Sequence, residues 1–255
     1  WNGLCRYDGY NIEVFNKESG NINALRNNFI YVLNEDHFGN IWVGTKEGLY
    51  VYLYNQHGFR HIASLGEDFS ALTGAVSVIE KAGGNSLWVG TDQGAMQAKV
   101  LDNKGTLEIL QHYPFGKSPE ALGGKTITSI LNAQDGSVWI GTDEGIHVLQ
   151  KGHKTFTRFS HDSYDPNSLS FNSVYCIYQD SKDRIWVGTE NGLNLYNKES
   201  NGFRHFFHQS TISNSLVHNA VTDIAEDKNG NIFISTLGGM SEYLGENNFR
   251  NYVNE

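Results

Sequence analysis

An aromatic motif flanked by glycines returns five times along this chain of 255 residues. Each copy reads approximately Gly-Asn-Ile-Trp-Val-Gly-Thr, and its aromatic anchor stands at positions 42, 88, 139, 186 and 233. The tail of one more copy opens the sequence, because Gly3 lies 45 residues before its counterpart Gly48. A period of this size predicts a fold made of repeated units, each of which is stabilised by its neighbours.

Each unit is predicted to form four short strands. The first carries apolar residues on both faces and is expected to be the most buried. The anchor lies on the second, a third follows a repeated glycine, and the fourth carries an aromatic pair such as Phe203 and Phe206. The 28 Gly, 5 Trp, 13 Tyr and 14 Phe favour short strands joined by tight turns. The apolar pairs on the first strands are Ile30/Leu33, Val76/Ile79, Ile127/Ile130, Val174/Ile177 and Val221/Ile224.

The turn residues support this pattern. The position three before the anchor always holds a residue that tolerates a left-handed backbone, as a tight hairpin requires. A Thr-x-x-Gly sequence follows the anchor and predicts a second tight hairpin. Trp42 and Gly44 face the same side of their strand, so the missing side chain should let the next sheet pack closely. The residues three before the anchors are Gly39, Asn85, Gly136, Asp183 and Gly230.

Four-stranded units of this length are typical of a β-propeller, so the predicted fold is all-β and the predicted architecture a single propeller domain over residues 1–255. Residues 1–18 supply only the two outer strands of a partial blade. Because a closed ring would need about 30 more residues before Trp1, we expect a fragment of a larger ring. Complete blades are expected at residues 29–65, 75–115, 126–160, 173–208 and 220–254.

Several runs resemble the two-component-regulator propeller repeat. One is D-x-x-G-N-I-W-V-G-T-x-x-G-L at Asp36–Leu49, with a near copy at Asp180–Leu193. The segments that lead into two first strands, Asn167–Val174 and Asn214–Val221, are also similar to it. The opening Trp1–Tyr10 resembles the first blade of such propellers in hybrid two-component sensors of Bacteroides-type bacteria. The departures are local: Ala95-Met96, Phe233 and Ser235.

The resemblance implies a fragment of a seven-bladed ring. In that family two such propellers and a small β-sandwich form the periplasmic part of a homodimeric sensor, and a membrane helix, a histidine kinase, a receiver and a DNA-binding region follow. The usual cue is an oligosaccharide released from a glycan. This chain carries no kinase motif and no phosphate-cradling G-x-x-x-x-G-K-S/T loop. It would therefore be a periplasmic sensor without catalysis of its own, and its partners would be the other domains of the polypeptide.

Charge, hydropathy and cysteine content argue against several other classes of protein. With 19 Lys and Arg against 28 Asp and Glu, the net charge of −9 argues against nucleic-acid binding. No apolar run approaches the 18 residues of a membrane span. Cys5 and Cys176 are too few for a disulfide scaffold or a four-cysteine zinc site. Two buried thiols are the favoured interpretation and a single bridge is the alternative; no cofactor is expected.

The candidate binding residues lie in loops at one end of the predicted blades. There, amide and charged groups around a central opening would suit a polar ligand such as a sugar, although simple solvation is the alternative. Aromatic residues near the start of the chain would stack on a sugar ring. The predicted ligand-binding residues are Asn28, Lys125, Asn172, Asn219 and Glu190, with Trp1, Tyr7 and Tyr10 as stacking partners.

Metal and catalytic interpretations are weaker. His205 and His208 have a spacing that does not place two ligands on one strand face, so a structural role is preferred. A calcium loop needs a bidentate glutamate that the acidic turns lack, so their aspartates are expected to form turns. An enzyme similar to streptogramin lyases, which place a histidine and acidic groups near the propeller axis, is the alternative function. A structural propeller that only mediates dimerisation is another. The turn aspartates are Asp36, Asp135, Asp180 and Asp227.

Overall fold

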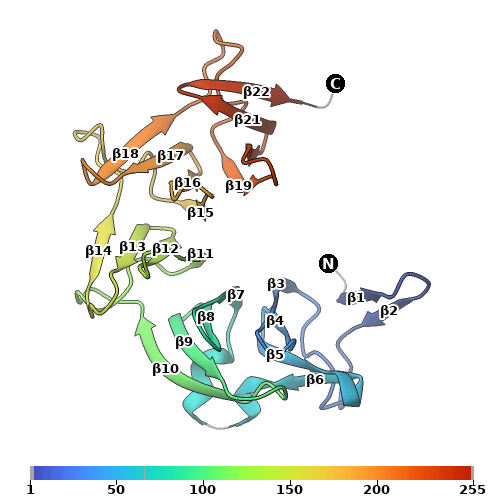
Figure 1. The fold of residues 1–255 in the computed structure, drawn as a ribbon. Coiled ribbons are helices and arrows are strands. Elements are labelled where there is room, and N and C mark those ends of the chain that lie inside the picture. Colours follow the sequence, from blue (N-terminus) through green and yellow to red (C-terminus); the bar gives the residue numbers. More distant parts are fainter. Residues whose placement is uncertain (1–2, 66, 254–255) are drawn as a thin grey trace. The chain divides into compact units, whose positions relative to one another are not determined.

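The computed structural model describes residues 3–65 and 67–253. Over these residues the chain is all-β, with five four-stranded sheets and one two-stranded sheet (Figure 1). In every sheet the strands are antiparallel and follow one another in chain order. The contacts divide the chain into two compact units, which are described separately. Unit 1 is Trp1–Phe115 with Lys125–Ile127, and unit 2 is Gly116–Gly124 with Thr128–Glu255.

Unit 1 contains the two-stranded sheet and two four-stranded sheets, together with three short 3-10 helices. The two-stranded sheet pairs β1 (Leu4–Tyr7) with β2 (Ile12–Phe15). The next sheet contains β3 (Ile30–Glu35), β4 (Ile41–Thr45), β5 (Gly48–Leu53) and β6 (Gly58–His61). The last contains β7 (Val76–Lys81), β8 (Ser86–Thr91), β9 (Gly94–Val100) and β10 (Leu107–Pro114). The 3-10 helices are η1 (Tyr54–Gln56), η2 (Ile62–Leu65) and η3 (Glu67–Leu72).

Unit 2 contains three four-stranded sheets of the same topology. The first comprises β11 (Ile127–Asn132), β12 (Val138–Thr142), β13 (Gly145–Leu149) and β14 (Phe156–Phe159). The second comprises β15 (Val174–Gln179), β16 (Ile185–Thr189), β17 (Gly192–Asn197) and β18 (Gly202–Phe206). The third comprises β19 (Val221–Glu226), β20 (Ile232–Thr236), β21 (Gly239–Gly245) and β22 (Asn248–Tyr252). Neighbouring sheets contact through their first two strands, β12 with β15 and β16 with β19.

The expectation that the first strand is the most buried was wrong. Every residue of β12 and β16 is buried, whereas β11 and β15 each contain half-buried positions. The second strand has a hydrogen-bonded neighbour on each side, whereas the first forms one edge of its sheet. On β3, Leu33 is 49% exposed, although its counterpart Ile79 is only 2% exposed.

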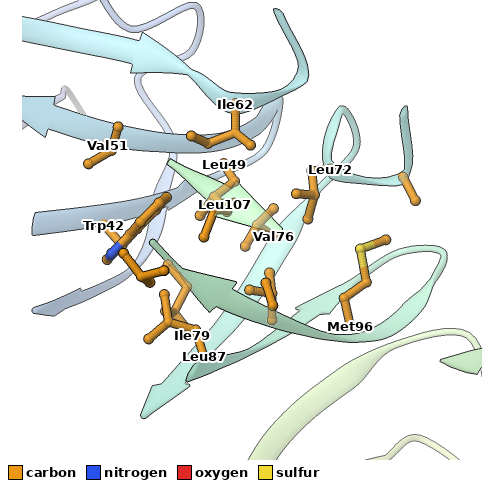
Figure 2. Close-up of a cluster of buried hydrophobic side chains, with 14 residues drawn as sticks. Trp42, Leu49, Val51, Ile62, Leu72, Val76, Ile79, Leu87, Met96 and Leu107 are labelled. Atoms are coloured by element: carbon orange, nitrogen blue, oxygen red, sulfur yellow. The ribbon is translucent and has the colours of Figure 1, made fainter. Parts of the chain in front are cut away.

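The aromatic anchors connect neighbouring sheets. Trp42 of β4 lies in one buried cluster with Ile79 and Leu87 of the following sheet, and Figure 2 shows these side chains together. Trp186 of β16 repeats the arrangement with Ile224 and Ile232. Neither tryptophan exposes any surface. Trp42 and Trp186 therefore each bury their ring against the next sheet of their unit, where burial of apolar surface stabilises the repeat.

The glycine two residues after the anchor permits this close packing, as predicted. A Cβ atom added to Gly188 would lie 2.5 Å from Cys176 Sγ and 2.6 Å from Val221 Cγ1. On Gly44 it would lie 2.7 Å from the carbonyl oxygen of Val76. Val221 and Val76 belong to the first strand of the following sheet, so a side chain here would push neighbouring sheets apart.

Replacing Gly188 with alanine is expected to destabilise the chain by about 1–3 kcal/mol, because an inserted methyl group overpacks the core. Chemical denaturation of both proteins would measure the difference in the free energy of unfolding. Gly83→Ala is the matched control, since nothing lies within 4 Å of a Cβ atom at that position. Equal stability of the Gly188→Ala variant and the parent would contradict the close approach.

An aspartate joins the first hairpin turn to the anchor. Asp180 Oδ1 accepts hydrogen bonds from the backbone N–H groups of Lys182 and Arg184. Asp180 Oδ2 accepts hydrogen bonds from Arg184 Nε at 2.6 Å and Trp186 Nε1 at 2.8 Å. Burial by itself raises the pKa of Asp180, but these hydrogen bonds and the Arg184 charge outweigh it and leave that pKa below its usual range.

The turn role predicted for the aspartates is confirmed, with one difference. Asp36 repeats the Asp180 pattern, and Asp227 caps its turn in the same way but next to Phe233. Asp135 is not equivalent: Ala133 stands six residues before the anchor there, and Asp135 accepts hydrogen bonds from Ser137 instead. The left-handed turn residues are Gly39, Gly136, Asp183 and Gly230, with Gly84 taking this role in place of Asn85.

The cysteines differ from the favoured expectation of two buried thiols. Both are free, but Cys5 is exposed and only Cys176 is buried. Cys5 is exposed because β1 belongs to a sheet of only two strands. Burial raises the pKa of Cys176 to about 12. No helix within the described residues is long and apolar enough to cross a membrane.

Candidate functional site

Three of the predicted ligand-binding residues hold the loops between sheets in place. The side-chain oxygens of Asn28, Asn172 and Asn219 each accept a hydrogen bond from the backbone N–H eleven residues earlier. These bonds measure 2.6, 2.7 and 2.6 Å and tie the segments after β2, β14 and β18 to the segments before β3, β15 and β19. The fold therefore uses the side-chain oxygen of each amide as a backbone acceptor. The donors are Lys17, His161 and His208.

In unit 2, three predicted residues lie at the same end of two neighbouring sheets. The backbone N–H of Glu190 donates to the carbonyl of Ser173 at 3.0 Å, next to Asn172. The backbone N–H of Gly192 donates to the carbonyl of Asn219 at 2.8 Å. Glu190 is exposed, and the two asparagines are half-buried. The structure thus brings the backbone of Glu190 next to Asn172, and that of Gly192 next to Asn219, at one end of the two sheets.

In unit 1 the predicted residues are dispersed. Asn28 lies where β1 begins, because its carbonyl accepts a hydrogen bond from Gly3. Tyr7 and Tyr10 are 68% and 93% exposed and lie at the other end of the β1–β2 hairpin. Lys125 is exposed just before β11, and Trp1 lies outside the described residues. The two tyrosines are therefore not beside Asn28.

His205 on β18 and His208 just after it have structural partners. His205 Nε2 lies 2.6 Å from the carbonyl oxygen of Ser168. Its counterparts Arg158 and Asn251 donate to carbonyls of the corresponding loops. His208 Nδ1 lies 2.8 Å from the carbonyl oxygen of Leu216. Within residues 3–65 and 67–253, no group of three His, Cys, Asp or Glu residues is placed to hold a metal ion.

A cavity that the sequence analysis missed lies at the opposite strand ends of unit 2. It has a volume of about 570 Å³ and opens between the β11–β14 and β15–β18 sheets. None of the eight predicted residues lines it. Its walls include Ser137, Trp139, Tyr196 and the carboxylate of Asp135. The only signal in the sequence is that Ser137 stands where the next repeat has Arg184.

Four segments of the chain match the family described as two component regulator propeller. They are residues 24–47, 121–144, 168–191 and 215–238. These four segments are two-component-regulator propeller repeats. This confirms the resemblance drawn from the repeated motif, and the propeller fold accounts for the four-stranded sheets.

Solved structures with the same fold include signalling, secretion and enzyme proteins. The extracellular domain of the hybrid two-component system BT4673 from B. thetaiotaomicron is 22% identical, with a TM-score of 0.58. PorZ, of the type-IX secretion system of Porphyromonas gingivalis, is 19% identical with a TM-score of 0.69. Virginiamycin B lyase from Staphylococcus aureus is 11% identical with a TM-score of 0.62.

The share of each relative that is covered differs. The match to the B. thetaiotaomicron domain covers 95% of the chain, and the chain spans 37% of the length of that domain. The match to PorZ covers 94% of the chain and 35% of PorZ. The match to the lyase covers 96% of the chain and 74% of the lyase. At these identities the likeness is one of fold. Curated protein sequences gave no match to the chain.

Proposed function

We propose that this chain is the ligand-sensing propeller of a periplasmic sensor, and that the parent protein is a hybrid two-component histidine kinase. The four two-component-regulator repeats carry this proposal. The shared fold with an extracellular domain of a hybrid two-component system supports it. Catalysis would belong to a kinase elsewhere in the polypeptide. The partners would be the other propeller and sandwich domains of that polypeptide and a second copy in a homodimer.

The proposed ligand is an oligosaccharide derived from a glycan. Sugar hydroxyl groups both donate and accept hydrogen bonds, so they suit a surface that combines amides with a carboxylate. Asn172, Glu190 and Asn219 offer this combination at one end of two sheets. Asn28 and Lys125 precede the first strands of two other sheets and are proposed as ligand contacts in unit 1. Stacking by aromatic residues near the start of the chain, Trp1, Tyr7 and Tyr10, remains part of the proposal.

Thermal unfolding of the chain with a panel of purified oligosaccharides tests this function. A ligand at about 100 times its dissociation constant adds about 2.7 kcal/mol of stability. For a chain of this size the unfolding midpoint should rise by roughly 5–11 °C, at about 2–4 °C per kcal/mol. Glu190→Ala should abolish the shift, whereas Glu199→Ala, an exposed carboxylate in the β17–β18 turn, should preserve it.

Two results would contradict the proposal. One is an unchanged midpoint with every oligosaccharide on a cooperatively unfolding sample. The other is metal-dependent turnover of virginiamycin B, which would favour the lyase-like alternative that shares the fold. A shift that survives in the Glu190→Ala variant would retain the sensor function but place the sugar elsewhere.

A further inference from the structure

An arginine fills the gap between the last two sheets of unit 2. The guanidinium carbon of Arg184 lies 5.1 Å from the ring centroid of Trp186 and 5.8 Å from that of Tyr243. The two rings meet edge to face, with centroids 5.0 Å apart and an interplanar angle of 69°. Arg184 Nε also donates to the carboxylate of Asp180 at 2.6 Å. A planar cation is thus held by two aromatic rings and one carboxylate, which is a favourable environment for guanidinium.

The gap between the two preceding sheets has the same aromatic pair without the arginine. Trp139 and Tyr196 meet with centroids 4.8 Å apart and an interplanar angle of 72°. The residue two before the anchor is Ser137 here and Arg184 in the next repeat. The cavity of about 570 Å³ lies at this position and is lined by both rings and by Ser137. The shorter side chain therefore leaves open a space whose counterpart holds a guanidinium group.

Carboxylates also line this cavity. Asp135 accepts hydrogen bonds from the backbone N–H of Ser137 at 2.9 Å and from its hydroxyl at 2.6 Å. The Ser137 hydroxyl in turn accepts a hydrogen bond from Trp139 Nε1 at 3.0 Å. The hydrogen bonds from Ser137 hold the pKa of Asp135 below its usual range, against the effect of burial. Asp183, which is exposed, adds a second carboxylate to the lining.

We propose that the cavity lined by Ser137, Trp139 and Tyr196 binds a guanidinium group carried by a ligand. The group would lie against the aromatic pair as Arg184 does in the next gap, with Asp135 in the role of Asp180. The volume exceeds that of a guanidinium alone and falls within the range of ligand sites, so it leaves room for the rest of an arginine residue. This site is separate from the proposed sugar surface, which lies at the other strand ends.

Two cations of the chain also line the cavity and set how tightly a ligand can bind. Arg184 is committed to Asp180 through a salt bridge of 2.6 Å. Lys198 is exposed and lies close enough to lower the pKa of Asp135. An ammonium group on a flexible stem is strongly hydrated, whereas guanidinium is weakly hydrated and stacks on aromatic rings. A ligand guanidinium should therefore bind beside Asp135 more favourably than the Lys198 ammonium group does.

Calorimetric titration of the whole chain with N-acetyl-arginine amide tests the proposal. One molecule should bind, and the isosteric but uncharged citrulline derivative should bind at least about tenfold more weakly. The lysine derivative should also bind more weakly, since it lacks the planar group. The guanidinium group could come from free arginine or from an arginine residue of a peptide. Comparing the affinity for free arginine with that for a short peptide that contains one arginine will distinguish these two sources.

One substitution fills the open gap and another opens the filled one. Ser137→Arg places a guanidinium group of the chain itself in the cavity, so it should abolish ligand binding without lowering the thermal midpoint. Arg184→Ser opens the next gap and should raise the stoichiometry from one to two.

Asp135→Asn should weaken binding about tenfold or more while leaving the far-UV circular dichroism unchanged. Equal binding of the citrulline derivative, or full binding by a folded Ser137→Arg variant, would overturn the proposal. Neither result would bear on the sugar panel.

Discussion

Replacing Trp186 with alanine is expected to lower the free energy of unfolding by about 3–5 kcal/mol, the usual cost of removing a buried tryptophan. Its indole exposes no surface and packs in one cluster with Ile224 and Ile232 of the following sheet. The substitution therefore opens a cavity between two sheets, and it also leaves Asp180 without the indole hydrogen bond. Chemical denaturation followed by circular dichroism would measure the change in the free energy of unfolding.

Trp186→Phe separates packing from hydrogen bonding. A phenyl ring keeps most of the buried surface but cannot donate to Asp180, so the expected loss is smaller, about 1–3 kcal/mol. Phe233 occupies the equivalent position of the last sheet, next to an aspartate that caps its turn without an indole partner. If the alanine variant lost less than the phenylalanine variant, the anchor would not be the main contact between these sheets.

The repeated turn residues made the strands predictable because each of these residues acts within its own hairpin. A glycine or aspartate three before the anchor defines a left-handed turn, and Thr189 Oγ1 donates to the carbonyl of Gly192 in the turn that follows. The burial of the first strand was harder to predict. Apolar residues on both faces of Ile30–Glu35 gave no indication that Leu33 would be half exposed. The exposure of Leu33 depends on which sheet packs against β3.

Polar residues in the loops do not by themselves identify which side chains bind a ligand. Asn172 and Asn219 were predicted as ligand contacts from their polar character, yet a recurring hydrogen bond to the backbone explains why an asparagine is there. The sequence alone does not reveal which atoms the fold already uses. The open cavity depends on Ser137 in one repeat and Arg184 in the next. That difference acquires a meaning only once Trp139 and Tyr196 are known to meet across two sheets.

Acid is expected to destabilise the first sheet of unit 2 through one buried histidine. His147 lies on β13 and is 2% exposed. Its Nε2 atom accepts a hydrogen bond from the backbone N–H of Gly123 at 2.9 Å, so the ring is neutral with its proton on Nδ1. That Nδ1 atom has no hydrogen-bond partner among the described residues. Burial, assisted by the charge of Arg158, lowers the pKa of His147 to about 4.

The direction of the pH effect follows from this low pKa. In the unfolded chain the histidine has a pKa of about 6.5, so the unfolded state binds its proton first as the pH falls. The contribution of His147 to the free energy of unfolding is therefore constant above about pH 6.5. It declines between about pH 6.5 and 4, by about 3 kcal/mol in total. Protonating Nε2 also removes the acceptor for Gly123, which ties the loop before β11 to the sheet.

His147→Gln tests this effect directly, because glutamine offers an oxygen acceptor to Gly123 but does not titrate. Urea unfolding at pH 7.5, 6.5, 5.5 and 4.5 should show the parent losing stability relative to the variant as the pH decreases. Asp135 and Asp180 also have lowered pKa values, and they contribute stability that is lost at more acidic pH. They are present in both proteins, so the difference between the two unfolding curves isolates His147. A difference that stays constant over this range would mean that His147 has the same pKa in the folded and the unfolded protein, as a ring accessible to water would.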